Sequence, residues 1–154
     1  MKYSICTTCY RSVNLVESFM KPLISLGKDY EVVVVDNYSD DGTFEKLRNY
    51  ESNVISLKKK CTRGKGRQTA MENSHGDISI HVEFDVKYSG LSSAIDYYEK
   101  SSQNKIYYFI IDGQKCNASL YIGKKELFQR YLIEVCFLGA VFVKMCQWLF
   151  TTVY

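Results

Sequence analysis

The chain has 154 residues, of which 46% are hydrophobic and 24% are charged. These values are typical of one globular domain of ordinary size, and they exclude a disordered or fibrous protein. The net charge of +3 does not by itself indicate a nucleic-acid-binding protein, since the mark of such proteins is positive charge concentrated on one face.

The chain enters a strand-like run directly after its first residues, without the pattern of a secretory signal. We therefore expect a cytoplasmic protein whose six cysteines stay reduced. Cys6 and Cys9 form a C-x-x-C pair, but no second pair follows at the spacing of a zinc site. The favoured interpretation is two small buried side chains.

Strand-like and helix-like segments alternate through the first half of the chain. Strands are predicted at 3–8, 31–36, 54–57 and 77–84, and helices at 13–26, 43–50 and 68–74. Pro22 is expected to kink or restart the first helix. The alternation predicts an α/β fold with a mainly parallel sheet and helices on both faces. In such sheets ligands bind beyond the carboxyl ends of the strands.

The second half of the chain is less regular. A helix is predicted at 91–100, strands at 106–111 and 118–122, and the start of a helix at 124–131. No internal repeat or low-complexity linker is present. We therefore expect a single domain over residues 1–154.

The segment 36–43, Asp-Asn-Tyr-Ser-Asp-Asp-Gly-Thr, directly follows a strand of four consecutive valines. A carboxylate at that point, Asp36, can accept hydrogen bonds from a base or a ribose. Ser39, Asp41 and Thr43 can cap the following helix, and Gly42 permits a tight turn. A capped loop without a ligand is the alternative interpretation.

The segment 63–67, Arg-Gly-Lys-Gly-Arg, lies between the third strand and a helix. Its glycines let the backbone approach a ligand, and its cations and the helix N-terminus favour a phosphate. We expect a loop over residues 58–66. A solvated basic loop is the alternative.

Glu83 and Asp85 close the fourth predicted strand. Side chains two residues apart on a strand point to the same face, so the two carboxylates could hold Mg²⁺ or Mn²⁺ together with diphosphate oxygens. Two exposed charges at a strand end are the alternative.

These three motifs together resemble glycosyltransferase family 2, whose members have the GT-A fold. Residues 36–43 are similar to the family's Asp-Asp/Asn-x-Ser-x-Asp-Gly-Thr motif, and 63–66 with Ala70 and Gly76-Asp77 to the Gly-Lys-Gly…Ala…Gly-Asp run of polyprenyl-phosphate sugar synthases. Glu83-Phe-Asp85 stands in the place of the DXD motif. The resemblance covers roughly residues 3–86, and more faintly 117–130.

The resemblance implies a GT-A-like (Rossmann-like) fold and a metal-dependent, inverting glycosyltransferase. A nucleotide-sugar-binding half (1–86) would be followed by a reduced acceptor half (87–131). The metal, Mn²⁺ or Mg²⁺, would be held by Asp85 and Glu83. The implied nucleotide-sugar site comprises Thr8, Tyr10, Asp36, Asn37, Ser39, Asp41, Arg63, Gly64, Lys65, Gly66 and Glu83.

The acceptor, a hydroxyl or a phosphate, and the catalytic base are not identified by any motif. Asp112 and Glu134 are the candidates for the base. Asp112 is also typical of a turn residue, and Glu134 of an interface residue in an apolar helix.

The segment 132–154 is apolar but interrupted by Glu134 and Lys144, which argues against a membrane-spanning helix. The favoured interpretation is a helix packed on the sheet or on a second subunit of a homodimer. The alternative is a helix at the cytoplasmic membrane surface, which Trp148 and Tyr154 would suit.

Two other functions stay open. One is a non-catalytic nucleotide-sugar-binding protein, which the missing base would suit. The other is a nucleic-acid-binding module that uses residues 58–67, the less favoured of the two.

Overall fold

The computed structural model describes residues 2–27, 29–50, 53–88, 90–110 and 119–129, and it contains a six-stranded sheet in the order β3-β2-β1-β4-β6-β5. The first four strands of this order run parallel, while β6 is antiparallel to both β4 and β5. The mainly parallel α/β fold predicted from the sequence is confirmed. The strands are β1 (Tyr3–Cys9), β2 (Tyr30–Asp36), β3 (Val54–Lys58), β4 (Ile78–His81), β5 (Tyr107–Ile110) and β6 (Ser119–Lys124).

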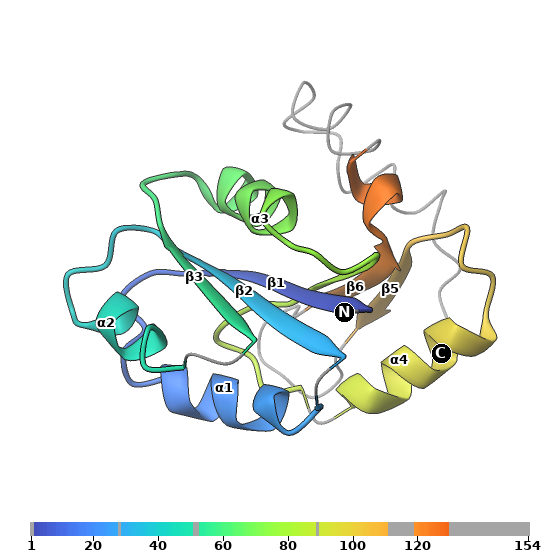
Figure 1. The fold of residues 1–154 in the computed structure, drawn as a ribbon, viewed down its shortest axis with the longest axis horizontal. Coiled ribbons are helices and arrows are strands. Elements are labelled where there is room, and N and C mark those ends of the chain that lie inside the picture. The colour runs from blue at the N-terminus through green and yellow to red at the C-terminus, as the bar shows by residue number, and fades with distance from the viewer. Residues whose placement is uncertain (1, 28, 51–52, 89, 111–118, 130–154) are drawn as a thin grey trace.

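Helices cover both faces of the sheet (Figure 1). The helix α3 (Arg63–Glu72) lies on one face, and α1 (Val16–Ile24) and α4 (Leu91–Lys100) lie on the other. The short helix α2 (Thr43–Leu47) follows the loop after β2. Residues 125–129, after β6, are also helical.

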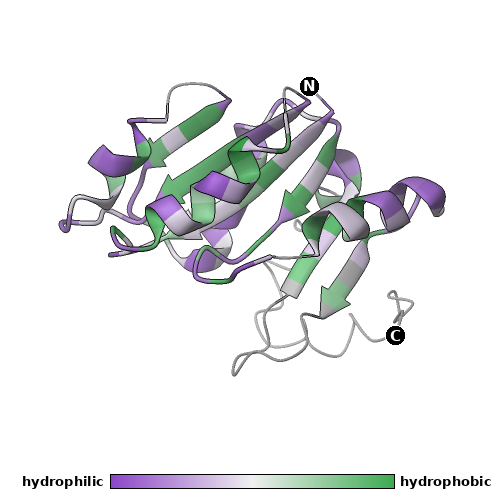
Figure 2. Cartoon of the chain, turned by 90° about the horizontal axis from the view of Figure 1, so that it is seen from below, coloured by the Kyte–Doolittle hydropathy of each residue, from purple (hydrophilic) through white to green (hydrophobic). Residues whose placement is uncertain are grey.

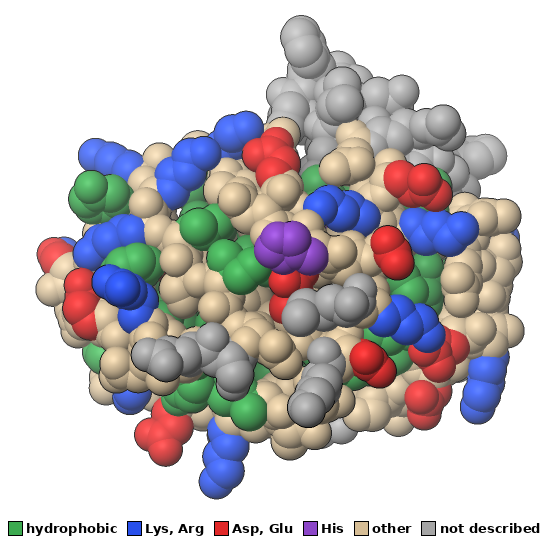
Figure 3. Space-filling model, viewed as in Figure 1, with side chains coloured by type: hydrophobic (Ala, Val, Ile, Leu, Met, Phe, Trp, Pro, Cys, Tyr) green, Lys and Arg blue, Asp and Glu red, His purple; other side chains and the backbone are tan. Residues whose placement is uncertain are grey.

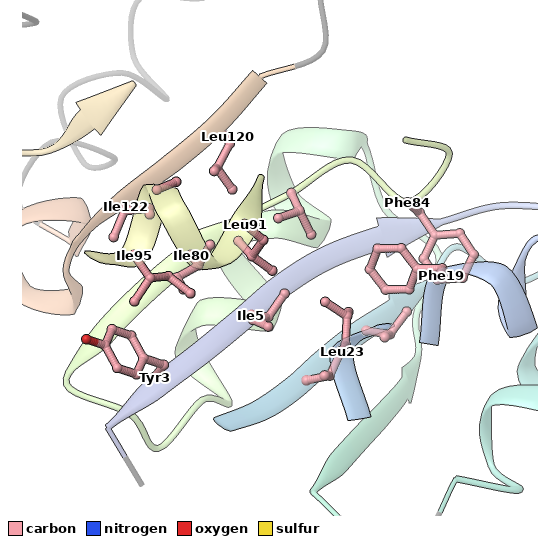
Figure 4. Close-up of a cluster of buried hydrophobic side chains, with 14 of the residues drawn as sticks. Tyr3, Ile5, Phe19, Leu23, Ile80, Phe84, Leu91, Ile95, Leu120 and Ile122 are labelled. Atoms are coloured by element: carbon pink, nitrogen blue, oxygen red, sulfur yellow. The ribbon is translucent and has the colours of Figure 1, made fainter. Parts of the chain in front are cut away.

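The valine run of β2 shows why the sheet is covered twice. Val32 and Val34 belong to the hydrophobic cluster shared with α1 and α4, whereas Val33 and Val35 belong to the cluster under α3. All four are buried because successive side chains of a strand point to opposite faces. The larger cluster is drawn in Figure 4, and Figure 2 shows hydrophobic residues concentrated along the central strands.

The first helix begins later than predicted and is not restarted by its proline. Residues 13–15 form turns, and α1 then runs without interruption from Val16 to Ile24 with Pro22 inside it. Pro22 is exposed and lies two residues before the end of the helix, so it can disturb little of the hydrogen-bonding ladder.

The prediction of a loop over residues 58–66 is wrong at its end, because Arg63 to Gly66 form the first turn of α3. Thr62 is the N-cap residue, and its hydroxyl accepts a hydrogen bond from the backbone N–H of Lys65 at 3.3 Å. A threonine cap satisfies one of the amides that a helix start leaves without a partner, so the helix can begin at a glycine-containing segment.

The fourth strand is shorter than predicted, since β4 ends at His81 and Phe84 and Asp85 lie in a turn. The alternation of burial nevertheless continues beyond the strand. Val82 and Phe84 are buried, while Glu83 is half-buried and Asp85 is exposed. Phe84 stacks on Phe19 of α1 with ring centroids 4.3 Å apart, and this contact anchors the acidic segment to the core.

Two segments for which the sequence made predictions lie outside the described residues. These are the turn at Asp112 and the apolar segment 132–154, which includes Glu134. Within the described ranges, none of the helices has the length and apolar character needed to span a membrane.

The opposite edge of the sheet, at the amino ends of the strands, is held by a buried carboxylate. Glu31 accepts hydrogen bonds from the hydroxyl of Ser4, from the backbone N–H of His75 and from that of Gly76. Burial raises the pKa of Glu31, but the hydrogen bonds from Ser4, His75 and Gly76 outweigh it and hold the pKa below its ordinary value. Gly76 is therefore a structural residue at the end remote from the acidic segment.

We predict that Gly76→Ala destabilises the fold by about 1–3 kcal/mol, as overpacking in a core does. A Cβ at this position would lie 2.6 Å from the Ser4 hydroxyl oxygen and 2.8 Å from the backbone carbon of Tyr3, which cannot move aside. Urea unfolding measures the change. Gly64→Ala is the matched control, because a Cβ there meets nothing within 4 Å and alanine favours the helix. Equal stability of the two variants would contradict the prediction.

Candidate active site at the carboxyl edge of the sheet

The loops that leave β1, β2 and β3 are bound to one another at the carboxyl edge of the sheet. The side-chain oxygen of Asn37 accepts a hydrogen bond from the backbone N–H of Cys61 at 2.8 Å. The backbone oxygen of Asp36 accepts one from the N–H of Lys59 at 2.9 Å. The loop after β2 and the loop after β3 therefore form one surface.

Asp36 is fully buried, and the protein itself supplies partners for both of its carboxylate oxygens. One oxygen accepts from the backbone N–H of Ser39 at 2.9 Å, and the other accepts from the Ser39 hydroxyl and lies 3.7 Å from the Cys9 sulfur. Burial, together with the negative charge of Asp36, raises the pKa of the Cys9 thiol well above its ordinary value. Asp36 thus closes its own loop, and its predicted contact with a nucleobase or ribose stays a prediction.

Three side chains of the 36–43 motif bind three successive backbone amides of the loop after β1. The hydroxyl of Ser39 accepts from the N–H of Arg11 at 2.8 Å, and that of Thr43 accepts from Ser12 at 2.8 Å. Asp41 accepts from the N–H of Val13 at 3.2 Å. Hydrogen bonds led by that from the Thr43 hydroxyl lower the pKa of Asp41.

Gly66, in the first turn of α3, allows that helix to approach β1. A Cβ on Gly66 would lie 2.5 Å from the methyl carbon of Thr8 and 3.2 Å from the Cys61 sulfur. Only a glycine fits this contact, so the first turn of α3 is held directly above the end of β1. The structure therefore brings two predicted site residues, Thr8 and Gly66, together.

Positive charge at this edge is concentrated in the segment from the end of β3 to the first turn of α3. Five cations are exposed at the end of β3 and the start of α3, and Figure 3 shows Lys and Arg side chains gathered at this end of the molecule. The amide groups of a helix N-terminus add further positive potential. The five are Lys58, Lys59, Lys60, Arg63 and Lys65.

The acidic segment after β4 meets the basic helix. Glu83 forms an ion pair with Arg67 of α3. The backbone N–H of Glu83 donates to the Tyr88 hydroxyl at 2.7 Å, and burial raises the pKa of Tyr88 to about 12. Asp85, two residues further along the same segment, is exposed. No group of three or more His, Cys, Asp or Glu side chains suited to a metal ion occurs within the described ranges.

A separate hollow of about 390 Å³ lies between α1 and the start of α4. Its lining includes Phe19, Leu23, Val86 and Leu91, and it contains none of the predicted site residues. The hollow is mostly apolar, so we do not assign it to the candidate site.

The family model described as Glycosyl transferase family 2 matches residues 4–101, which include all the strand ends that carry the site. The chain belongs to this family. The resemblance inferred from residues 36–43, 63–67 and 83–85 is confirmed.

Curated relatives of this family member are much longer than it is. It is 34% identical over 95 residues to an uncharacterized glycosyltransferase, YfnE, of Bacillus subtilis, which covers 56% of this chain and 24% of the relative. It is 26% identical over 114 residues to the poly(ribitol-phosphate) beta-glucosyltransferase of Bacillus spizizenii, which covers 68% of this chain and 18% of the relative. The chain thus spans at most about a quarter of the length of these two relatives.

Solved structures share the fold of this family 2 chain at low sequence identity. TarS 1–349 of S. aureus has a TM-score of 0.68 and 18% identity, covering 85% of this chain and 49% of that one. The mannosyltransferase PcManGT of Pyrobaculum calidifontis has a TM-score of 0.70 and 17% identity, covering 84% and 46%. The predicted GT-A-like fold is confirmed.

The sequence did not predict that His81, the last residue of β4, is a buried titratable side chain. Its Nε2 is buried without a hydrogen-bond partner, and its ring packs against Phe128 with centroids 4.6 Å apart. Burial, aided by the positive charge of Arg67, lowers the pKa of His81 to about 4. The imidazole is therefore neutral near pH 7. Only the paired register of His81 with Cys6 and Tyr121 places it in the interior, and no sequence pattern gives that register.

We predict that His81→Leu removes part of the acid sensitivity of this family 2 domain. The folded-state pKa of about 4 lies below the ordinary value of 6.5, so protonation favours the unfolded state and stability is lost as the pH falls between these values. The linkage amounts to roughly 2 kcal/mol at pH 5. The difference between the melting temperatures of the two proteins should be constant near pH 8 and should shift in favour of the variant as the pH falls to 5. Parallel curves would contradict the prediction.

Proposed function

We propose that the chain supplies the donor-binding part of a glycosyltransferase that moves a sugar from a UDP- or GDP-sugar to a hydroxyl or phosphate acceptor. The observation that carries the proposal is that the segments following four strands, β1, β2, β3 and β4, meet at one edge of the sheet. Gly66 touches Thr8, Arg67 pairs with Glu83, and Asn37 binds the backbone of Cys61. A base, a diphosphate and its counterions would have to meet at such a place.

In this proposal the basic start of α3 binds the diphosphate. Arg63, Gly64 and Lys65 are exposed on the first turn, where helix amides and cations both attract phosphate oxygens. Their charge would offset the negative charge that builds up on the leaving diphosphate during transfer. Gly66 serves by letting this turn approach β1.

The nucleoside would lie over the loops after β1 and β2. Tyr10 is 53% exposed at the end of β1, and Asn37 is half-buried after β2. Asp36, Ser39 and Asp41 support this surface through their bonds to neighbouring backbone, and we infer that they shape the nucleoside site even where they do not touch the ligand.

A divalent cation, Mn²⁺ or Mg²⁺, fits the acidic segment. Asp85 offers an exposed carboxylate, and these ions are commonly held by one or two carboxylates completed by phosphate oxygens and water. Glu83 already pairs with Arg67, so we assign Asp85 the direct contact and Glu83 a secondary one. When bound, the cation would act as a Lewis acid toward the diphosphate.

Ligands named for the structural neighbours support this donor class. TarS 1–349 has been solved with UDP and with UDP-GlcNAc, and PcManGT with GDP-Man and Mn²⁺. Because their identity to this chain is only 17–18%, they do not select one nucleotide here.

The proposal places the acceptor in the second part of the chain. Residues 87–131 would form a reduced acceptor half of a single domain, and Asp112 or Glu134 would act as the base in an inverting transfer. Both lie outside the described residues. We further propose a cytoplasmic location, with 132–154 at a homodimer interface or at the membrane face.

We predict that a UDP- or GDP-sugar with Mn²⁺ stabilises the protein, because a ligand that binds only the folded state raises its stability. At a ligand concentration of 100 times Kd the gain is about 2.7 kcal/mol, and the melting temperature rises by roughly 5–10 °C. Asp85→Ala should abolish the metal-dependent part of this shift. The measurement is a thermal-shift panel of UDP, GDP, UDP-GlcNAc and GDP-Man with and without Mn²⁺.

Asp77→Ala is the matched control for this panel, since Asp77 is an exposed aspartate at the amino end of β4. It should keep the full shift. No stabilisation of the wild type by any nucleotide would contradict the donor site. Stabilisation without release of nucleotide in the presence of acceptors would favour a non-catalytic binding protein, and steeply salt-dependent binding to DNA or RNA that ignores Asp85 would favour the nucleic-acid reading.

A further inference from the structure

The exposed ring of Tyr10 is backed by a charged brace that no motif predicts. The guanidinium carbon of Arg11 lies 5.4 Å from the centroid of the Tyr10 ring. Arg11 in turn donates two hydrogen bonds to Asp40, from Nε to Oδ1 at 2.8 Å and from Nη2 to Oδ2 at 2.7 Å. The brace therefore joins the loop after β1 to the loop after β2.

The backbone of the brace is held in an uncommon conformation. Arg11 has a φ of 45°, in the left-handed region that residues with a side chain rarely adopt. Its N–H is bound by the Ser39 hydroxyl, and the next two amides are bound by Thr43 and Asp41. A strained residue persists only where the surroundings fix it, and such sites cluster where a ligand is bound.

We propose that Arg11 and Asp40 are positioning residues that hold the Tyr10 ring in place to receive the nucleobase of the donor. The inference rests on the proposed function, since it needs a nucleoside at this edge. A side chain that is fixed before the ligand arrives loses less conformational freedom on binding, which raises affinity without a new contact. The bidentate geometry suits this task, because two hydrogen bonds from Nε and Nη2 fix the orientation of the guanidinium plane.

Another possibility is that Arg11 binds the diphosphate directly, and the two roles predict opposite effects of one variant. Asp40→Asn weakens the brace and leaves the charge of Arg11 available. If Arg11 served the diphosphate, releasing it from Asp40 would leave donor affinity unchanged or increase it. If Arg11 serves Tyr10, affinity falls.

The experiment measures the Kd of UDP and of GDP by calorimetry, using the nucleotide that binds the wild-type full chain. We expect Asp40→Asn to raise Kd three- to tenfold, and Arg11→Gly to raise it by a similar or larger factor. The melting temperature of Arg11→Gly should not fall, because glycine adopts a positive φ without strain. A purely structural role of Arg11 would instead lower it.

A double-mutant cycle connects the brace to the ring. In a Tyr10→Ala background, Asp40→Asn should change Kd by less than about 1.5-fold, since the brace then has no ring to hold. Glu99→Gln is the matched control, because it converts another exposed ion-pair carboxylate, bonded to Lys2 at 2.5 Å at the amino end of the sheet, to an amide. It should leave Kd unchanged.

The outcomes distinguish failure of the positioning role from failure of the donor site itself. Suppose that the wild type binds nucleotide. If Asp40→Asn then leaves Kd unchanged or lowers it, or raises Kd by the same factor in the Tyr10→Ala background as in the wild type, the positioning role of Arg11 and Asp40 is wrong and the donor site is unaffected. If the wild type binds no nucleotide, both fail.

Discussion

Everything at the site depends on the parallel pairing of β1 with β2 on one side and β4 on the other. Parallel strands end at the same edge, so Cys9 pairs with Asp36, and Asp36 pairs with Lys58. Segments that are distant in sequence are brought together by this constraint alone. An antiparallel neighbour would have carried its following loop to the opposite edge, where Glu31 and Gly76 instead form the structural anchor.

The order of elements could be predicted because each strand has a distinct apolar pattern. Four valines in succession fit only a strand buried on both faces, and the two clusters that divide them confirm that interpretation. The positions of the motifs after strands followed from the same order. The α/β class and the location of the candidate site at the carboxyl edge could thus be predicted from the sequence.

What the sequence could not supply were the exact ends of elements and the fine geometry. Arg63 to Gly66 had the composition of a loop, yet a threonine cap and the contact of Gly66 with Thr8 make them helical. The fourth strand ends early at His81, although the alternation of buried residues runs on. The positive φ of Arg11 depends on hydrogen bonds from another loop, and no local pattern contains that information.

Within the 36–43 motif, most of the polar side chains bind other parts of the protein. Ser39, Asp41 and Thr43 all accept hydrogen bonds from the loop after β1, and Asp36 is enclosed by its own turn. Side chains committed to the protein in this way define a shape and contribute few contacts to a ligand. In the function proposed above, recognition of the donor would then fall to the groups that this framework leaves exposed, namely the Tyr10 ring, the first turn of α3 and the Asp85 carboxylate. It follows that a substitution in the motif would act on a donor mainly by moving the loop after β1.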